Sequence, residues 1–153
     1  MSSQDLAQLH SSVQTLELPS REDFGTVETR IADKTSRRAI LPKQNFDYIR
    51  FCLRIPELKG VIVGDFELVS EDTVLDGHSG LFLPASDSLV LLWRGRVAVP
   101  QDLFYEVLQY CHKKSDHGDF SQTLAIVRQY YTFVPSRIVR GFVDACPTCA
   151  IKR

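Results

Sequence analysis

The chain has 153 residues, of which 44% are hydrophobic and 24% are charged; this composition suits one folded domain, or a compact module with a flexible N-terminal part, and argues against wholesale disorder. No apolar run approaches the roughly 20 residues that a membrane span needs, and the N-terminus lacks the basic start and apolar stretch of a secretory signal. We therefore expect an intracellular protein without a membrane partner, whose four cysteines are reduced thiols or metal ligands rather than disulfides.

The net charge of -1 conceals an asymmetry along the chain. Residues 1–93 carry 9 Lys/Arg and 14 Asp/Glu, whereas residues 94–153 carry 9 and 5, so the two parts have net charges of -5 and +4. A basic segment favours an anionic partner, although loosely spaced basic residues are also typical of a solvated surface. An anionic partner and a merely solubilising surface therefore both stay open.

Residues 1–36 are polar and rich in Ser, Thr and Gln, which predicts a flexible N-terminal segment. Within this segment, apolar residues recur at helical spacing, at Leu6, Leu9, Val13 and Leu16. Such spacing is typical of a short surface helix, of a frayed tail, or of a helix that binds a partner. The pattern does not distinguish among these three.

Residues 37–99 are predicted to form a helix followed by a small antiparallel sheet. The helix ends at Pro56, and its apolar face consists of Phe46, Ile49 and Leu53. Segments rich in Val, Leu and Phe, separated by turn residues, are predicted to be strands: 60–69, 80–83 and 88–99. Cys52 is expected to be a buried thiol beside the apolar face of the helix, and His78 a solvated residue.

Residues 100–153 are predicted to form a domain of three short helices. The first spans 101–113, the second runs from Asp119 or Ser121 to about residue 131, and the third begins at Pro135, because proline suits a first helical turn. Their predicted buried faces consist of Leu103, Val107, Leu108 and Cys111, then Leu124, Val127 and Tyr131, then Ile138, Val139, Phe142 and Val143. Three short helices bury little surface by themselves, so we expect a metal ion to hold them together.

The ends of these helices carry two histidines and two cysteines: His112, His117, Cys146 and Cys149. Four residues separate the histidines, two separate the cysteines, and 28 lie between the pairs. Imidazole nitrogens and thiolates hold Zn²⁺ in closed tetrahedral sites. The alternatives are a redox pair of cysteines, unrelated surface histidines, and cysteines that are merely buried; a redox pair, however, opens a helix, and these cysteines close one. The sequence thus predicts one structural zinc ion and an α+β fold, with a small antiparallel sheet followed by a zinc-stapled three-helix bundle.

Further motifs accompany the four ligands, in the order Arg94-Gly95-Arg96, Val99-Pro100, His117-Gly118, Thr123, Tyr130-Tyr131-Thr132-Phe133, Cys146-Pro147-Thr148-Cys149 and Lys152. In type and order, residues 88–153 resemble the zinc-binding domain that precedes the catalytic core in integrases of retroviruses and gypsy-type retrotransposons. Two features depart from the gypsy-type pattern: the spacing of the histidines is shorter, and Phe133 stands where a tryptophan is common. The preceding sheet is similar to the extended N-terminal region of some of these integrases.

This resemblance implies a domain that binds DNA without catalysis and helps integrase subunits to assemble, and hence a nuclear protein. The strand-transfer chemistry of the family belongs to a separate core, in which three carboxylates hold divalent metal ions. That core would begin after Cys149, where only residues 150–153 remain. We therefore expect no enzyme, but a fragment of an integrase or a domesticated descendant of its N-terminal part.

Basic residues of the C-terminal part are the expected contacts to DNA, through its phosphates and without sequence specificity: Lys113, Lys114, Arg128, Arg137, Arg140, Lys152 and Arg153. Arg137 and Arg140 are three residues apart, so they lie near one another on the surface of the third helix. For each residue alone, a solubilising role fits the sequence equally well. The alternative function is a module for self-association or for binding another protein, with no direct nucleic-acid role.

Overall fold

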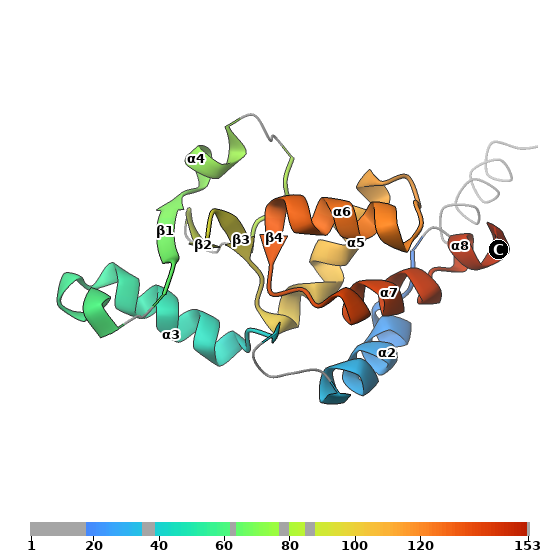
Figure 1. Ribbon diagram of the computed structural model, residues 1–153, viewed down its shortest axis with the longest axis horizontal. Coiled ribbons are helices and arrows are strands. Elements are labelled where there is room, and N and C mark those ends of the chain that lie inside the picture. Colours follow the sequence, from blue (N-terminus) through green and yellow to red (C-terminus); the bar gives the residue numbers. More distant parts are fainter. Residues whose placement is uncertain (1–17, 35–38, 62–63, 77–79, 85–87, 153) are drawn as a thin grey trace, which may run out of the picture.

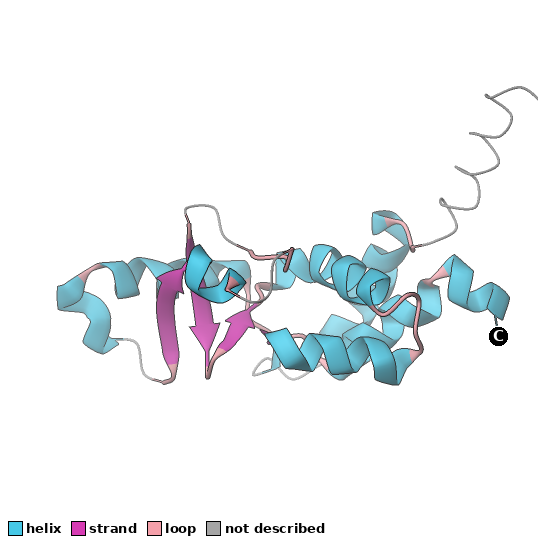
Figure 2. Ribbon diagram, turned by 90° about the horizontal axis from the view of Figure 1, so that it is seen from above, coloured by secondary structure: helices cyan, strands magenta, loops and turns pink. Residues whose placement is uncertain are grey.

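The computed structural model describes residues 18–34, 39–61, 64–76, 80–84 and 88–152. It is elongated, with a small sheet at one end and most of the helices at the other (Figures 1 and 2). The helices are α2 (Arg21–Lys34), α3 (Lys43–Arg54), α4 (Glu71–Leu75), α5 (Phe104–Lys114), α6 (Phe120–Tyr130), α7 (Ser136–Ala145) and α8 (Pro147–Lys152), with short 3₁₀ helices η2 (Pro56–Val61) and η3 (Gln101–Leu103). The strands are β1 (Phe66–Ser70), β2 (Leu89–Trp93), β3 (Arg96–Ala98) and β4 (Tyr131–Thr132). None of the described helices is long and apolar enough to span a membrane.

The predicted α+β class is confirmed, and its sheet has the strand order β1-β2-β3-β4. β1 and β2 are antiparallel, as are β2 and β3, which are joined by a two-residue turn at Arg94-Gly95. Both turn residues have positive φ, 52° and 82°, which is the conformation that a tight hairpin turn of type I′ requires and that glycine adopts without strain. The segment 88–99, predicted as one strand, is therefore a hairpin of two strands, and of the predicted strand 60–69 only the second part forms β1.

The fourth strand makes the sheet mixed rather than purely antiparallel. β4 follows α6 and pairs with β3 in parallel, with Val97 opposite Tyr131 and Ala98 opposite Thr132. Between the two strands the chain passes through η3, α5 and α6, a crossover that a parallel pair needs. Two residues are too short a strand to give a sequence pattern, so β4 was not predicted. It joins the helical part directly to the sheet.

The prediction of a strand at 80–83 is wrong. These residues have no regular structure, yet Leu81 is only 7% exposed. The carbonyl oxygen of Phe82 accepts a hydrogen bond of 2.7 Å from the Tyr131 hydroxyl. The segment is therefore apolar because it packs against the helical part, and not because it pairs with another strand.

Helix α2 lies within the segment that sequence analysis described as flexible and polar, residues 1–36. The expected pattern at Leu6–Leu16 lies outside the described residues. In α2, Phe24 is 1% exposed and its ring contacts those of Tyr105 and Phe142, with centroids 5.9 and 5.3 Å apart. Few apolar residues mark this helix in the sequence, and its place in the core depends on helices that come more than 80 residues later.

Two clusters of buried side chains lie on opposite faces of the sheet. The main cluster joins α2, α5, α6 and α7 to the sheet and includes Val90, Val97, Phe104, Leu108 and Phe142. The smaller cluster lies under α3 and consists of Leu41, Phe46, Leu91 and Ala98. Neighbouring strand residues such as Val90 and Leu91 belong to different clusters because side chains alternate across a sheet. The sheet is thus covered on both faces.

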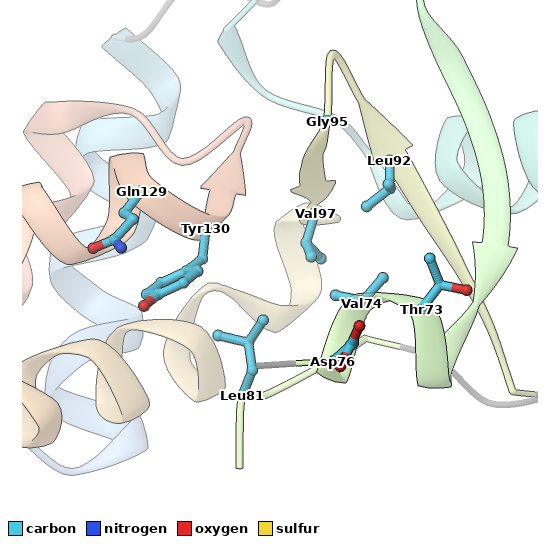
Figure 3. A pocket seen from close by; sticks show the side chains of 9 residues that line it. All are labelled: Thr73, Val74, Asp76, Leu81, Leu92, Gly95, Val97, Gln129 and Tyr130. Carbon is cyan, nitrogen blue, oxygen red and sulfur yellow. The ribbon is translucent and has the colours of Figure 1, made fainter. Parts of the chain in front are cut away.

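A pocket with a volume of about 480 Å³ lies where the sheet meets α6 (Figure 3). Figure 3 shows Tyr130 on one side of it, Val74 and Asp76 of the α4 region on the other, and Val97 of β3 between them. Side chains from both parts of the molecule therefore form its walls.

Candidate metal centre

The four predicted ligands lie together in the helical part. His112 is in the last turn of α5, His117 in the loop before α6, Cys146 directly after α7, and Cys149 in α8. One ligand atom from each residue can be chosen so that all four lie within 4.8 Å of one another. His112 and Cys146 are fully buried, Cys149 is 7% exposed, and His117 is half-buried. Within the described part of the chain, these residues form a closed cluster.

The distances between donor atoms fit a tetrahedral zinc ion. Zn–N bonds of about 2.05 Å and Zn–S bonds of about 2.3 Å place neighbouring N and S atoms of a tetrahedron about 3.5 Å apart. Cys146 Sγ lies 3.4 Å from His117 Nδ1, and Cys149 Sγ lies 3.3 Å from His112 Nε2. Two thiolates also balance the charge of one Zn²⁺. Since the protein supplies all four ligands, the ion would stabilise the fold and would not need a coordinated water.

Thr123 determines which nitrogen of His112 faces the site. Its Oγ1 lies 3.0 Å from His112 Nδ1, and both residues are fully buried. Nδ1 is therefore the N–H that donates to Thr123, and Nε2 is left as the lone pair that faces Cys149. Groups that bind the second nitrogen of a histidine ligand fix its tautomer and its ring orientation.

Ser115 connects the same histidine to the loop that follows. Its hydroxyl donates to the carbonyl oxygen of His112 at 2.8 Å, and it accepts from the backbone N–H of Gly118 at 3.1 Å. Because the single proton of Ser115 is used in this way, the 3.3 Å contact with Thr123 Oγ1 has Thr123 as its donor. Ser115 was not among the predicted site residues; its signal in the sequence is a serine between two ligands at the end of a helix.

The loop that carries His117 turns sharply after α5. Asp116 and His117 both have φ of 55°, a left-handed conformation that costs a residue other than glycine about 1–2 kcal/mol. The backbone N–H of His117 donates to the carbonyl of His112 at 3.1 Å, which closes the turn. The two histidine rings therefore approach each other, with centroids 4.8 Å apart.

Gly118 is required by the start of α6. Asp119 and Gln122 form a capping box, in which each side chain accepts a hydrogen bond of 2.9 Å from the backbone N–H of the other. A Cβ on Gly118 would lie 2.5 Å from Gln122 Oε1 and 2.8 Å from Gln122 Cβ. The absence of a side chain thus lets the capped helix begin directly after the ligand His117.

The two cysteines are brought together by the change from α7 to α8. Cys146 ends α7 in an extended conformation, and Pro147 begins α8, where the missing N–H of proline costs nothing. The N–H of Ala150 then donates to the carbonyl of Cys146 at 3.0 Å. This turn of helix places Cys149 beside Cys146. α8 itself was not predicted, since six residues give too little periodicity.

The remaining described cysteines belong to the core rather than to the metal site. Cys111 precedes His112 but points into the main hydrophobic cluster, and burial raises the pKa of its thiol to about 12. Cys111 is not among the residues whose ligand atoms lie together at the metal site. Cys52, in α3, is 1% exposed, so the expectation of a buried thiol is confirmed. His78 lies outside the described residues.

The predicted nucleic-acid contacts are distributed over several helices. Arg137 and Arg140 are exposed on α7, on the side away from its buried residues, and both line the groove between α7 and α2. The Arg140 guanidinium also lies 4.0 Å from the centroid of the Phe120 ring. The structure therefore brings these two arginines together on one surface.

The other candidates lie elsewhere. Lys113 is exposed at the end of α5, while Lys114 lies over the rings of Tyr110 and Tyr130, 5.6 Å from each centroid. Arg128 is exposed on α6, and its carbonyl accepts a hydrogen bond of 3.0 Å from Arg96. The Lys152 side chain and Arg153 lie outside the described part of the structure.

Comparison with known proteins agrees with this geometry. The protein-family model of the integrase zinc-binding domain matches residues 99–153. No match was found among curated proteins or among solved structures. The matched part is the zinc-binding domain, and no catalytic integrase domain was found in the 153 residues. Residues 99–153 are therefore an integrase zinc-binding domain, and their cluster of His112, His117, Cys146 and Cys149 is typical of a structural zinc site.

Proposed function

We propose that the chain is a non-catalytic module that binds DNA through its phosphate backbone, with α7 as the main contact. The observation that carries this proposal is the placement of Arg137 and Arg140. Both guanidiniums are exposed on one side of α7, whereas Ile138, Val139 and Phe142 on its other side are fully buried. A guanidinium offers several N–H donors in a fixed plane, which suits phosphate oxygens.

The zinc site supports this role by making α7 rigid. Cys146 follows the last residue of α7, and its Sγ lies 3.4 Å from Nδ1 of His117, so a metal ion held by both would connect that end of the helix to the loop after α5. Basic side chains on a fixed helix lose less freedom on binding than side chains on a loop. In this proposal His112 and His117 are metal ligands and not catalytic bases. The module would act in the nucleus, and the location of a fluorescent fusion of the chain in cells would test this.

The experiment is a titration of zinc-loaded protein against a labelled DNA duplex of mixed sequence, at several salt concentrations. We expect log K to fall linearly with log salt, because phosphate contacts release counterions. Arg137→Glu combined with Arg140→Glu should abolish binding and leave the circular dichroism spectrum unchanged. Arg54→Glu, at the far end of α3, is the control with the same charge change and should bind nearly as well. A flat titration of the wild-type protein would exclude this function.

Self-association is a second candidate, which a different observation favours. On α3, Tyr48 and Phe51 are 54% and 55% exposed and lie three residues apart, so their rings occupy neighbouring positions on the helix surface. Large apolar side chains that are exposed side by side often mark an interface. Light scattering should then give twice the monomer mass, and Tyr48→Ser with Phe51→Ser should restore the monomer. A monomer at high concentration would reject this candidate.

A further inference from the structure

A groove with a volume of about 480 Å³ runs between α2 and α7. Val27 and Ile31 of α2 and Gly141 of α7 contribute its apolar part. Its charged residues are Arg30 from α2 and Arg137, Arg140 and Asp144 from α7. Three guanidiniums and one carboxylate thus line the same groove, which gives it a local excess of positive charge although the whole chain has a net charge of -1.

Gly141 is the reason that the two helices lie so close. It is buried, and a Cβ at this position would lie 2.6 Å from Ile31 Cδ1 and 2.7 Å from Val27 Cγ1. A side chain at this position would force Ile31 or Val27 to shift, so the glycine allows α2 to pack closely against α7. Figure 1 shows α2 next to α7, and the two helices are in direct contact. This close packing brings Arg30, the residue before Ile31, to the same groove as the arginines of α7.

Glu28 of α2 lies near α5 and not in this groove. Arg21 forms an ion pair with Glu106 of α5, and Glu28 lies near the same pair. Arg30 is two residues beyond Glu28, on the opposite side of a helix with 3.6 residues per turn. The groove between α2 and α7 therefore receives Arg30 from α2, on the side of this helix away from the ion pair with α5. Asp23, seven residues before Arg30, lies on the same side of α2 but is not one of the residues that line the groove.

The guanidinium of Arg140 is held in place before any ligand binds. It lies 4.0 Å from the centroid of the Phe120 ring, a cation–π contact with an aromatic residue of α6. A guanidinium whose face is covered by a ring still presents its N–H groups at its edge. Such an edge is suited to the non-bridging oxygens of a phosphodiester.

We propose that Arg30 joins Arg137 and Arg140 in one phosphate-binding surface, so that α2, which lies outside the segment matched by the integrase domain, is part of the DNA-binding site. The inference rests on the proposed function and adds to it a third contact from another helix. Its partner is the phosphate backbone of a nucleic acid, because three guanidiniums line the groove and the planar N–H donors of a guanidinium suit phosphate oxygens.

The test uses the full chain with zinc bound, a labelled duplex of mixed sequence, and salt concentrations between about 50 and 200 mM. Loss of one phosphate contact lowers the slope of log K against log salt by about 0.9, so the affinity ratio between these two salt concentrations should fall by about 3.5-fold in Arg30→Gln. Arg30→Lys keeps the charge and should keep the slope. Arg54→Gln is the control for removing one positive charge from an exposed helix position.

The outcomes separate this inference from the function on which it rests. If Arg30→Gln binds with the affinity and slope of the wild type while Arg137→Gln is weakened, α2 is not part of the site and the DNA-binding function stands. If Arg30→Gln weakens binding without changing the slope, Arg30 acts through the fold and the inference is wrong. If the wild-type protein binds a polyglutamate peptide and not the duplex, both proposals fail.

Discussion

Thr123 Oγ1 lies 3.0 Å from His112 Nδ1, in a part of the molecule where both side chains are fully buried. Ser115 completes a ring of three hydrogen bonds: His112 donates to Thr123, Thr123 to Ser115, and Ser115 to the carbonyl of His112. Every hydroxyl proton in this ring has an acceptor. The residues around the ligands thus determine how His112 can face a metal ion.

Thr123→Val removes one hydroxyl while keeping the shape of the side chain, and it leaves the N–H of His112 without its acceptor. Changes of this kind beside a metal ligand typically weaken metal binding by about 10–100-fold. We expect such a loss in a competition between the protein and a coloured zinc chelator. Thr123→Ser keeps the hydroxyl and should bind zinc nearly as tightly as the wild type. Equal zinc affinities of Thr123→Val and Thr123→Ser would show that the hydrogen bond between Thr123 and His112 does not contribute to zinc affinity.

Removal of a ligand should unfold much of the helical part. Elemental analysis of the wild type should find about one zinc ion per chain, and Cys146→Ser or His117→Ala should lose it. Because structural zinc contributes about 10–16 kcal/mol in small metal-dependent domains, we expect a large loss of helical circular dichroism in both variants. Acid should have the same effect, since thiolates and neutral imidazoles must take up protons.

The control for this experiment is Cys52→Ala, which removes a buried thiol from α3, away from the cluster. It should keep one zinc ion per chain and a helical spectrum. If the metal-free protein or the Cys146→Ser variant unfolds at the same temperature as the zinc-loaded wild type, the site has no structural role.

Gly141→Ala should separate α2 from α7. The new Cβ would lie 2.6 Å from Ile31 Cδ1 and 2.7 Å from Val27 Cγ1, which is closer than the van der Waals contact distance of two carbon atoms that are not bonded to each other. Overpacking of this kind costs about 1–3 kcal/mol, measurable by urea unfolding. Ile31→Val deletes the nearer of the two atoms and should recover part of the loss when combined with Gly141→Ala. An unchanged free energy of unfolding in Gly141→Ala would contradict the close packing of the two helices.

Glu28 should destabilise the protein near neutral pH. Partial burial, and then the negative charge of Glu106, raise the pKa of Glu28 above its ordinary value of 4.5. The folded state therefore holds this proton more tightly than the unfolded state, and the stability contributed by the protonated form is lost as the pH rises through the raised pKa. Glu28→Gln should increase Tm at about pH 7 and have a smaller effect at about pH 5, with a gain below about 1 kcal/mol because the group is partly solvated.

Glu22→Gln provides the matched control, since Glu22 is exposed on the same helix. It should change Tm little at either pH. A lower Tm of Glu28→Gln at neutral pH would mean that the attraction between Glu28 and Arg21 outweighs the cost of burial, contrary to the direction of the pKa shift.

Local patterns accounted for the metal ligands and for the three helices that position them. His112 and His117 are five residues apart and Cys146 and Cys149 three apart, so each pair is brought together by the chain next to it. Helices α5, α6 and α7 have apolar stripes at the helical period, and their observed buried residues include Val107, Val127 and Phe142. In such features, residues that are a few positions apart in the sequence are also close in space, so the sequence is enough to predict them.

Local patterns were insufficient wherever an element depends on distant residues. β4 has two residues and exists because β3 offers its edge, and the segment 80–83 is apolar because Tyr131 and its neighbours cover it. Ser115 became part of the metal centre only once the fold placed it against Thr123.

By itself, the sequence determined the zinc ligands and the order of the helices that carry them, since both depend on short spacings along the chain. Only the tertiary structure decided that α2 packs on α7 and that Arg30 shares a groove with Arg137 and Arg140. The physical reason is that this packing depends on the close approach of Val27 and Ile31 to Gly141, which has no side chain. These residues are more than 100 positions away from Gly141 in the sequence. The spacing of apolar residues within one helix does not predict a contact of this kind between two distant helices.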